Sequence, residues 1–123
     1  MVPAIYGKRM KVIMISLWIL VIALFVAAAA IPNFMVMEGH QDTMLHITGF
    51  CIMMMVPAML VRRPLHISLI VIALFGVGVG VEFMQSFVDG RSSSLRDVYA
   101  NIGGLGLGLI VGYLLRPVSP DSN

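Results

Sequence analysis

The sequence predicts an all-α, polytopic membrane protein, a bundle of four transmembrane helices with both termini in the cytoplasm. Two observations predict this fold class: 59% of the 123 residues are hydrophobic and only 11% are charged, and the apolar residues gather in four runs. Each run is close to the roughly 20 residues that cross a hydrocarbon core. No soluble domain of this length could bury so much apolar surface. Because no long linker divides the chain, residues 1–123 form one domain.

The four apolar runs are separated by short breaks that contain helix-ending residues. The breaks are Pro32-Asn33, residues 62–64 and residues 88–94, and each includes proline, asparagine or glycine. Because these connections are short, consecutive helices are expected to be antiparallel neighbours. The predicted spans cover residues 12–31, 44–61, 65–87 and 95–115.

Lysine and arginine lie mainly at one end of this predicted bundle, which gives its expected orientation. Only Arg91 and Arg96 fall at the other end. The positive-inside rule therefore places both termini in the cytoplasm, and basic residues that flank apolar runs in this way do not indicate a nucleic acid partner. The six residues at the cytoplasmic end are Lys8, Arg9, Lys11, Arg62, Arg63 and Arg116.

The first apolar run also has a second interpretation. Its basic start and the alanines at positions 27–30 resemble a cleavable signal peptide, whose removal would leave three spans and an external N-terminus. The run is long enough to cross the bilayer, so we expect it to remain as a transmembrane helix.

Glycines spaced four apart indicate where helices approach closely in lipid. The third run contains Gly76 and Gly80, and the fourth contains Gly104, Gly108 and Gly112. We expect these two helices to pack against each other. The same stripes could instead mediate a homo-oligomer, and the spacing does not separate the two.

Polar residues gather at the predicted outer end of the bundle. Ionisable groups in or beside a span are costly and commonly face the bundle interior or a polar cavity. Glu82 is the deepest acid, about 8 Å below Phe87 along the helix. Spacings of three or four residues place three pairs on shared helix faces: Asp42 with His46 if that helix begins by residue 42, Glu82 with Gln85, and Asp97 with Asn101.

Several of these residues also have a purely structural interpretation. Glu82 could lock helix packing through a hydrogen bond to a neighbouring polar side chain, and His46 could do the same. Ser94-x-x-Asp97 is typical of a capping box at a helix N-terminus. Arg91 could grip a phosphate or carboxylate bidentately or pair with an acid at the surface. Both interpretations stay open.

The polar motifs occur in a definite order: Asp42-x-x-x-His46, Glu82-x-x-Gln85, Gly90-Arg91, Asp97-x-x-x-Asn101 and Gly104. This series, over residues 41–112, resembles the VanZ-like membrane proteins, and VEFMQSFVDGRSSSLRDVYANIGG is its most specific part. The resemblance implies a single VanZ-like membrane domain in a cell-envelope setting. The founding member of that family is associated with low-level resistance to the glycopeptide teicoplanin.

The favoured function is binding of a cell-envelope or lipid-linked ligand, either a lipid-linked precursor or a glycopeptide, or docking of an envelope-biosynthesis partner. The ligand would sit at the extracytoplasmic side of the cytoplasmic membrane. A channel or transporter is less well supported because the polar groups stop at one end. The functional cluster comprises Asp42, His46, Glu82, Gln85, Arg91, Asp97 and Asn101.

The alternative function is a membrane-embedded enzyme that modifies a lipid-linked or headgroup substrate at the outer leaflet. Asp42 and His46 would form a base, Glu82 an acid or base, and Arg91 would hold an anionic headgroup. The sequence contains no HExxH motif, phosphate-binding glycine loop or activated serine or cysteine nucleophile. Catalytic residues and cofactor are therefore not assigned. No metal ligands are assigned either, although a metal-dependent variant would use His46, Glu82 and Asp97.

Overall fold

The computed structural model describes residues 6–32, 39–90 and 93–118 and contains four helices and no strand in these ranges. Each helix is long and apolar enough to cross a membrane, which confirms the predicted all-helical, four-span fold. The second helix begins five residues before the predicted span, so it includes Asp42 in its first turn. The helices are α1 (Lys8–Ala30), α2 (Gly39–Leu60), α3 (Pro64–Gln85) and α4 (Leu95–Leu114).

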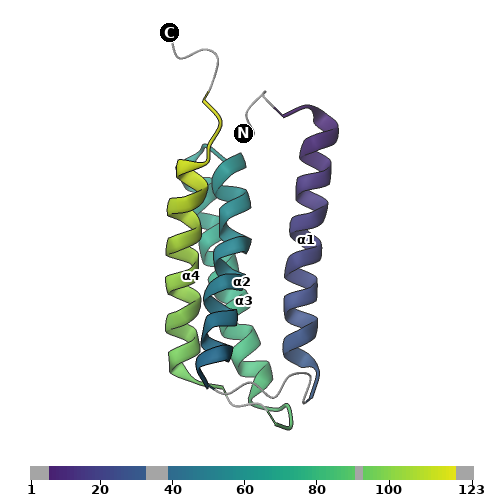
Figure 1. Cartoon of the computed structure of the whole chain (residues 1–123), viewed down its shortest axis with the longest axis vertical. Coiled ribbons are helices and arrows are strands. Elements are labelled where there is room, and N and C mark those ends of the chain that lie inside the picture. The colour runs from purple at the N-terminus through teal and green to yellow at the C-terminus, as the bar shows by residue number, and fades with distance from the viewer. Residues whose placement is uncertain (1–5, 33–38, 91–92, 119–123) are drawn as a thin grey trace.

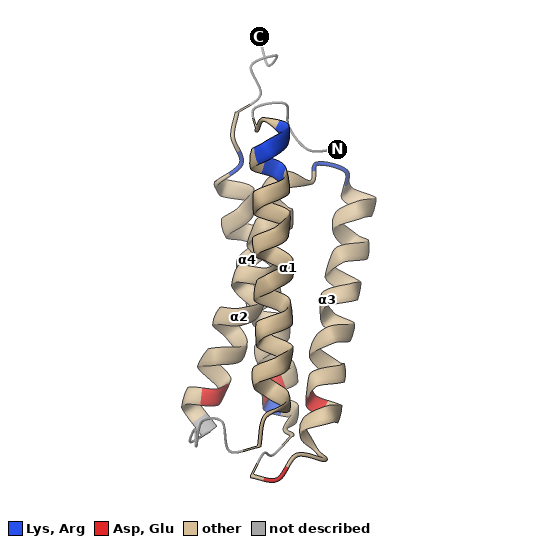
Figure 2. Ribbon diagram, turned by 90° about the vertical axis from the view of Figure 1, so that its right-hand side faces the viewer, with Lys and Arg blue, Asp and Glu red and all other residues tan. Residues whose placement is uncertain are grey.

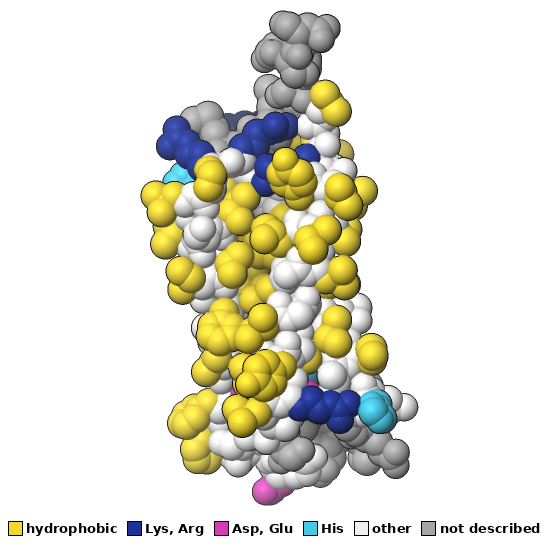
Figure 3. Space-filling model, turned by 90° about the vertical axis from the view of Figure 1, so that its left-hand side faces the viewer, with side chains coloured by type: hydrophobic (Ala, Val, Ile, Leu, Met, Phe, Trp, Pro, Cys, Tyr) yellow, Lys and Arg dark blue, Asp and Glu magenta, His cyan; other side chains and the backbone are white. Residues whose placement is uncertain are grey.

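The helices run alternately up and down, so that the start of α1 and the end of α4 lie at the same end of the bundle (Figure 1). Most lysine and arginine residues lie at this end, here called the basic end, and the acidic residues that the structure describes lie near the opposite, polar end (Figure 2). Asp42, Glu82 and Asp97 belong to the helix turns at this polar end. Hydrophobic side chains dominate the surface between the two ends (Figure 3). The separation of charge agrees with the predicted pattern, and its direction across a membrane remains a prediction.

Helix α2 lies at the centre of the core. Its buried side chains include Phe50, Met53 and Met54, which pack with Leu74 of α3 and Leu105 of α4. In contrast, α1 stands to one side of the bundle (Figure 1) and has only Ala29 buried. The core is therefore built by α2, α3 and α4, with α1 packed against it.

A proline inside α2 determines how α1 attaches. Pro57 has no backbone N–H, so the carbonyl of Met53, four residues earlier, cannot form its normal helical hydrogen bond. The indole Nε1 of Trp18 in α1 donates to this oxygen at 2.6 Å. An unsatisfied carbonyl is expensive in an apolar environment, so the Trp18 bond both repairs α2 and anchors α1.

The glycines of α4 contact α2. A Cβ atom at Gly104 or Gly112 would lie 2.5 Å from a carbonyl oxygen of α2, and one at Gly108 would contact the carbonyl of Cys51. Because only glycine lets the two backbones approach so closely, these positions fix the α2–α4 contact.

Helices α3 and α4 contact each other as predicted, but the expectation that their glycine stripes make this contact is wrong. A Cβ at Gly76 or Gly80 of α3 would meet nothing within 4 Å, whereas the stripe of α4 packs on α2. Glycine spacing predicts a close approach but does not name the partner helix. Whether the exposed Gly76 and Gly80 mediate a homo-oligomer stays a prediction.

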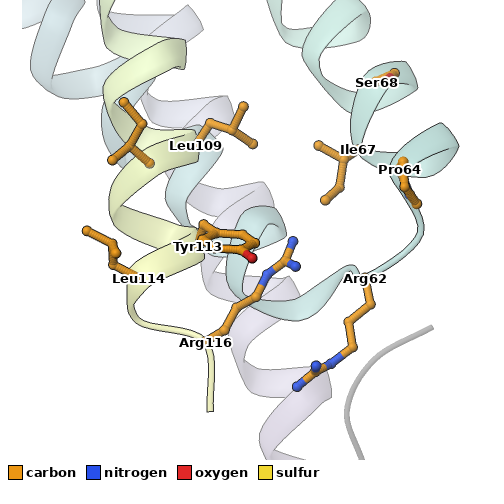
Figure 4. A pocket seen from close by; sticks show the side chains of 9 residues that line it. Arg62, Pro64, Ile67, Ser68, Leu109, Tyr113, Leu114 and Arg116 are labelled. Carbon is orange, nitrogen blue, oxygen red and sulfur yellow. The ribbon is translucent and has the colours of Figure 1, made fainter. Parts of the chain in front are cut away.

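At the basic end, Arg116 satisfies two carbonyls, one in the last turn of α2 and one directly after it. Its Nε donates to the Ala58 oxygen at 2.7 Å and its Nη2 to the Val61 oxygen at 2.9 Å, groups that have no partner within the helix. The guanidinium carbon lies 4.8 Å from the centre of the Tyr113 ring. Figure 4 shows this contact beside a groove of about 480 Å³ between α3 and α4.

Candidate polar site

The polar end of the bundle holds a buried group of polar side chains. His46 and Asn101 are each 1% exposed, Gln85 is 2%, and Glu82 and Asp97 are each 5%. Asp42 is only partly buried. Arg91, the remaining residue of the predicted cluster, lies outside the described residues.

His46 is the centre of this group. Its Nδ1 lies 2.8 Å from Oδ1 of Asn101 in α4, and its Nε2 lies 3.5 Å from Oε1 of Glu82 in α3 and 3.9 Å from Oδ1 of Asp42, one turn earlier in α2. Because an amide oxygen only accepts, the Asn101 bond places hydrogen on Nδ1. The second ring nitrogen therefore faces two carboxylates.

Glu82 connects α3 to the start of α4. Its Oε2 accepts a hydrogen bond of 3.2 Å from the backbone N–H of Ser94, the N-cap residue of α4. Its Oε1 is buried and has no hydrogen-bond partner in the described part of the chain. One oxygen thus has a structural role, while the other points toward His46.

Asp97 forms the predicted capping box with Ser94. The backbone N–H of Asp97 donates to the Ser94 Oγ at 3.2 Å, and this hydroxyl donates to Oδ2 of Asp97 at 2.7 Å. The other oxygen, Oδ1, accepts a bond of 3.1 Å from Oγ1 of Thr43 in α2. The arrangement differs from the standard box, because Glu82 rather than the N3 residue accepts the N–H of the cap.

Two apolar groups complete the surroundings of the imidazole. The ring of Phe25 from α1 meets the His46 ring edge-on, with centroids 5.6 Å apart. Gly78 of α3 leaves room for Asn101, because a Cβ there would lie 2.8 Å from the amide nitrogen. Residues from all four helices therefore surround this polar site.

A pocket of about 320 Å³ lies between α3 and α4 beside this group. Among the described residues that line the pocket, Glu82 is the only member of the predicted cluster. The lining is mixed, with hydroxyl groups and apolar side chains: Val79, Glu82, Phe83, Ser86, Ser93, Ser94, Leu95 and Val98.

Comparison with known proteins identifies the family. The family model described as VanZ/LLP1 matches residues 11–116. The chain belongs to the VanZ/LLP1 family. A relative of this VanZ/LLP1 protein is an uncharacterized protein of Schizosaccharomyces pombe, with 40% identity over 53 residues, which are 43% of this chain and 32% of that protein. The match thus spans about a third of the relative's length. No solved structure matches the chain.

The structure brings most of the predicted residues of this VanZ/LLP1 protein together. Asp42, His46 and Asp97 each present one atom within 4.8 Å of the others, and Glu82 and Asn101 contact His46 directly. Gln85 is buried nearby, and its Oε1 has no hydrogen-bond partner among the described residues. Five of the predicted residues therefore lie together at the polar end, and their role as a functional site stays a prediction.

Sequence reasoning missed Thr43 and Phe25. Thr43 is three residues before His46, a spacing that places both on one helix face, so this signal was available. Phe25 carried no signal, because nothing in the sequence shows which side of α1 packs on α2. The exposed His40, whose Nδ1 lies 2.9 Å from the Nη2 of Arg96, is outside the site.

Proposed function

We propose that this VanZ/LLP1 protein binds the polar headgroup of a membrane-embedded, cell-envelope ligand at its polar end. The observation that supports this proposal is the pocket between α3 and α4, which joins the buried polar site to the surface of the bundle through Glu82. A pocket whose mostly apolar lining includes one carboxylate and several serines suits an amphiphile, whose head and chain need different environments.

The lining of the pocket favours a headgroup that carries hydroxyl or amine groups. Glu82 offers an acceptor, and Ser93 offers a hydroxyl group that both donates and accepts. The hydroxyl of Ser86 already donates to the Phe83 carbonyl at 2.6 Å and offers only an acceptor. A sugar of a lipid-linked envelope precursor has this chemistry. Such a ligand would be bound at the extracytoplasmic leaflet of the cytoplasmic membrane, as the distribution of basic residues predicts.

A test is native mass spectrometry of the full chain from mild detergent, comparing wild type with Val79→Phe and Asp89→Asn. Val79 is exposed and lines the pocket, so the larger ring should fill the pocket without changing a polar group. Asp89 is an exposed acid in the α3–α4 turn and serves as the matched control. We expect a retained lipid mass in wild type and Asp89→Asn that is lost in Val79→Phe. Equal retention in all three, or none in wild type, would refute the proposal.

Family membership leads to a further proposal, that the protein acts when the cell meets a glycopeptide. If this protein binds a lipid-linked precursor, less of that precursor would be accessible to teicoplanin. Expression of wild type in a teicoplanin-sensitive bacterium should therefore reduce susceptibility, and Val79→Phe should restore it. An unchanged susceptibility on expression of wild type would remove this part of the proposal without affecting ligand binding.

The enzymatic alternative is favoured by the contact between His46 and two carboxylates, an arrangement that general bases use. Mass spectrometry also distinguishes catalysis from binding. If the protein is an enzyme, incubation with membrane extract should produce a lipid of changed mass. Retention of an unmodified ligand supports binding alone.

A further inference from the structure

We propose that Asp42, His46, Glu82 and Asp97 bind one divalent transition-metal ion. One atom each of Asp42, His46 and Asp97 lies within 4.8 Å of the others, and Oε1 of Glu82 lies 3.5 Å from the ring of His46. The four residues come from α2, α3 and α4, so the ion would join the three helices that form the core.

The orientation of His46 is the first argument. The Asn101 oxygen takes the hydrogen of Nδ1 at 2.8 Å, which leaves the lone pair of Nε2 directed at the carboxylates of Glu82 and Asp42. Two acceptors that face each other in a buried site need a hydrogen or a cation between them, and a metal ion would satisfy both at once. A ligating histidine commonly donates its other ring N–H to an oxygen in this way, which fixes the tautomer and the ring orientation.

The charge of the site is the second argument. Neither Glu82 nor Asp97 forms an ion pair with a lysine or arginine among the residues that the structure describes. Glu82 is 5% exposed, and its Oε1, which has no hydrogen-bond partner there, faces the imidazole. A buried charge is costly unless it is paired or coordinates a metal, so a bound cation would satisfy this oxygen.

Two of the separations between the proposed ligand atoms are close to those of a real coordination sphere, and Asp97 lies within 4.8 Å of Asp42 and His46. Ligand atoms bound at the usual 2.0–2.2 Å in a tetrahedron lie about 3.4 Å from one another. The Glu82–His46 separation of 3.5 Å already fits, and the Asp42–His46 separation of 3.9 Å needs a shift of a few tenths of an ångström. Asp97 is oriented by Thr43 and Ser94, as hydrogen bonds orient ligating carboxylates in other metal sites.

The donor set indicates the kind of ion. One imidazole nitrogen with carboxylate oxygens suits Zn²⁺, Mn²⁺ or Fe²⁺, whereas Mg²⁺ and Ca²⁺ prefer oxygen alone. Since Glu82 also lines the pocket between α3 and α4, the ion would sit where a ligand hydroxyl could reach it. The inference thus deepens the proposed function and rests on it only for the identity of that ligand, because metal content is measured without any lipid.

The experiment is metal analysis of the full chain in mild detergent. A chelator first removes bound metal, and separate samples are then loaded with Zn²⁺ or Mn²⁺. Gel filtration removes excess metal, and elemental mass spectrometry measures the metal content per chain. We expect one ion per wild-type chain, loss of the ion in His46→Gln and Asp97→Asn, and full retention in the control Asp89→Asn. An Asn101→Ala variant should bind about 10–100-fold more weakly, as loss of an orienting partner usually causes.

A second measurement keeps the test valid if a variant fails to fold. Co²⁺ added to the stripped wild-type chain should give the intense visible absorption of a low-coordinate site, and Zn²⁺ should abolish it. Absence of bound Zn²⁺ and Mn²⁺ together with the weak spectrum of hydrated Co²⁺ would refute the metal site, as would equal metal content in wild type and a folded His46→Gln. Normal metal content with no retained lipid would instead refute only the proposed function.

Discussion

The bond between Trp18 and the Met53 carbonyl gives a quantitative prediction about how α1 is held. Trp18→Phe removes the only indole of the chain and leaves a fully buried carbonyl oxygen without the donor that Pro57 cannot supply. An unsatisfied buried acceptor costs about 1–3 kcal/mol, and we expect a loss of unfolding free energy in that range.

A double-mutant cycle separates this bond from simple packing. In a Pro57→Ala background, residue 57 regains its N–H and can bond to the Met53 oxygen in the normal helical pattern, so Trp18→Phe should cost about 1–2 kcal/mol less there. The assay is unfolding in mixed detergent and SDS micelles followed by far-ultraviolet circular dichroism, which does not depend on the lost indole. An equal cost of Trp18→Phe in both backgrounds would show that Trp18 acts only by filling space.

Three further predictions concern other contacts. Gly108→Ala should destabilise the α2–α4 contact by about 1–3 kcal/mol, whereas Gly80→Ala, which meets nothing within 4 Å, should be nearly neutral in the same unfolding assay. Arg116→Ala should cost about 1–2 kcal/mol, because two carbonyls at the end of α2 lose their donor, and a cost below the error of the assay would contradict this role. For the orientation, cysteine is introduced singly as Asp89→Cys or Arg63→Cys in a chain that lacks Cys51. In whole cells an impermeant thiol reagent should label only the Asp89→Cys variant, and labelling of only the Arg63→Cys variant would overturn the predicted orientation.

The sequence was sufficient for features that depend on one helix at a time. Span positions follow from apolar length, and the shared face of Asp42 and His46 follows from their spacing of four once α2 begins at Gly39. The capping box at Ser94 and Asp97 was also predicted and is confirmed. These features need no knowledge of how the helices are rotated.

Features that depend on pairs of helices could not be predicted in the same way. The spacing of Asp97 and Asn101 predicts that they share a face of α4, but only the structure identifies His46 of α2 as the partner of Asn101. The bond from Glu82 to the N–H of Ser94 joins a helix end to a side chain twelve positions earlier, and no periodicity encodes it. Helix rotation, which an apolar surface leaves weakly specified in lipid, decides both.

The packing of Phe25 bears on the two interpretations of the first span. Phe25 and Trp18 are two helical turns apart, so both lie on one face of α1, and this face contacts α2 through the Met53 carbonyl and the rings of His46 and Phe50. Gly49 makes room for it, since a Cβ there would lie 2.6 Å from the Phe25 ring. This specific contact between α1 and the other helices favours the interpretation of the first span as a permanent transmembrane helix.

We therefore predict that α1 remains in the mature protein and closes the polar site on one side. The intact mass of the chain purified from bacterial membranes should include residues 8–30, and a chain that begins after Ala30 would overturn the prediction. Phe25→Ala should leave the four spans in place but open the His46 side of the site. Bound ligand should then be retained less well than in the matched variant Leu24→Ala, because the Leu24 side chain is 60% exposed. Equal retention in the two variants would mean that α1 is only a membrane anchor and that the site is complete within α2, α3 and α4.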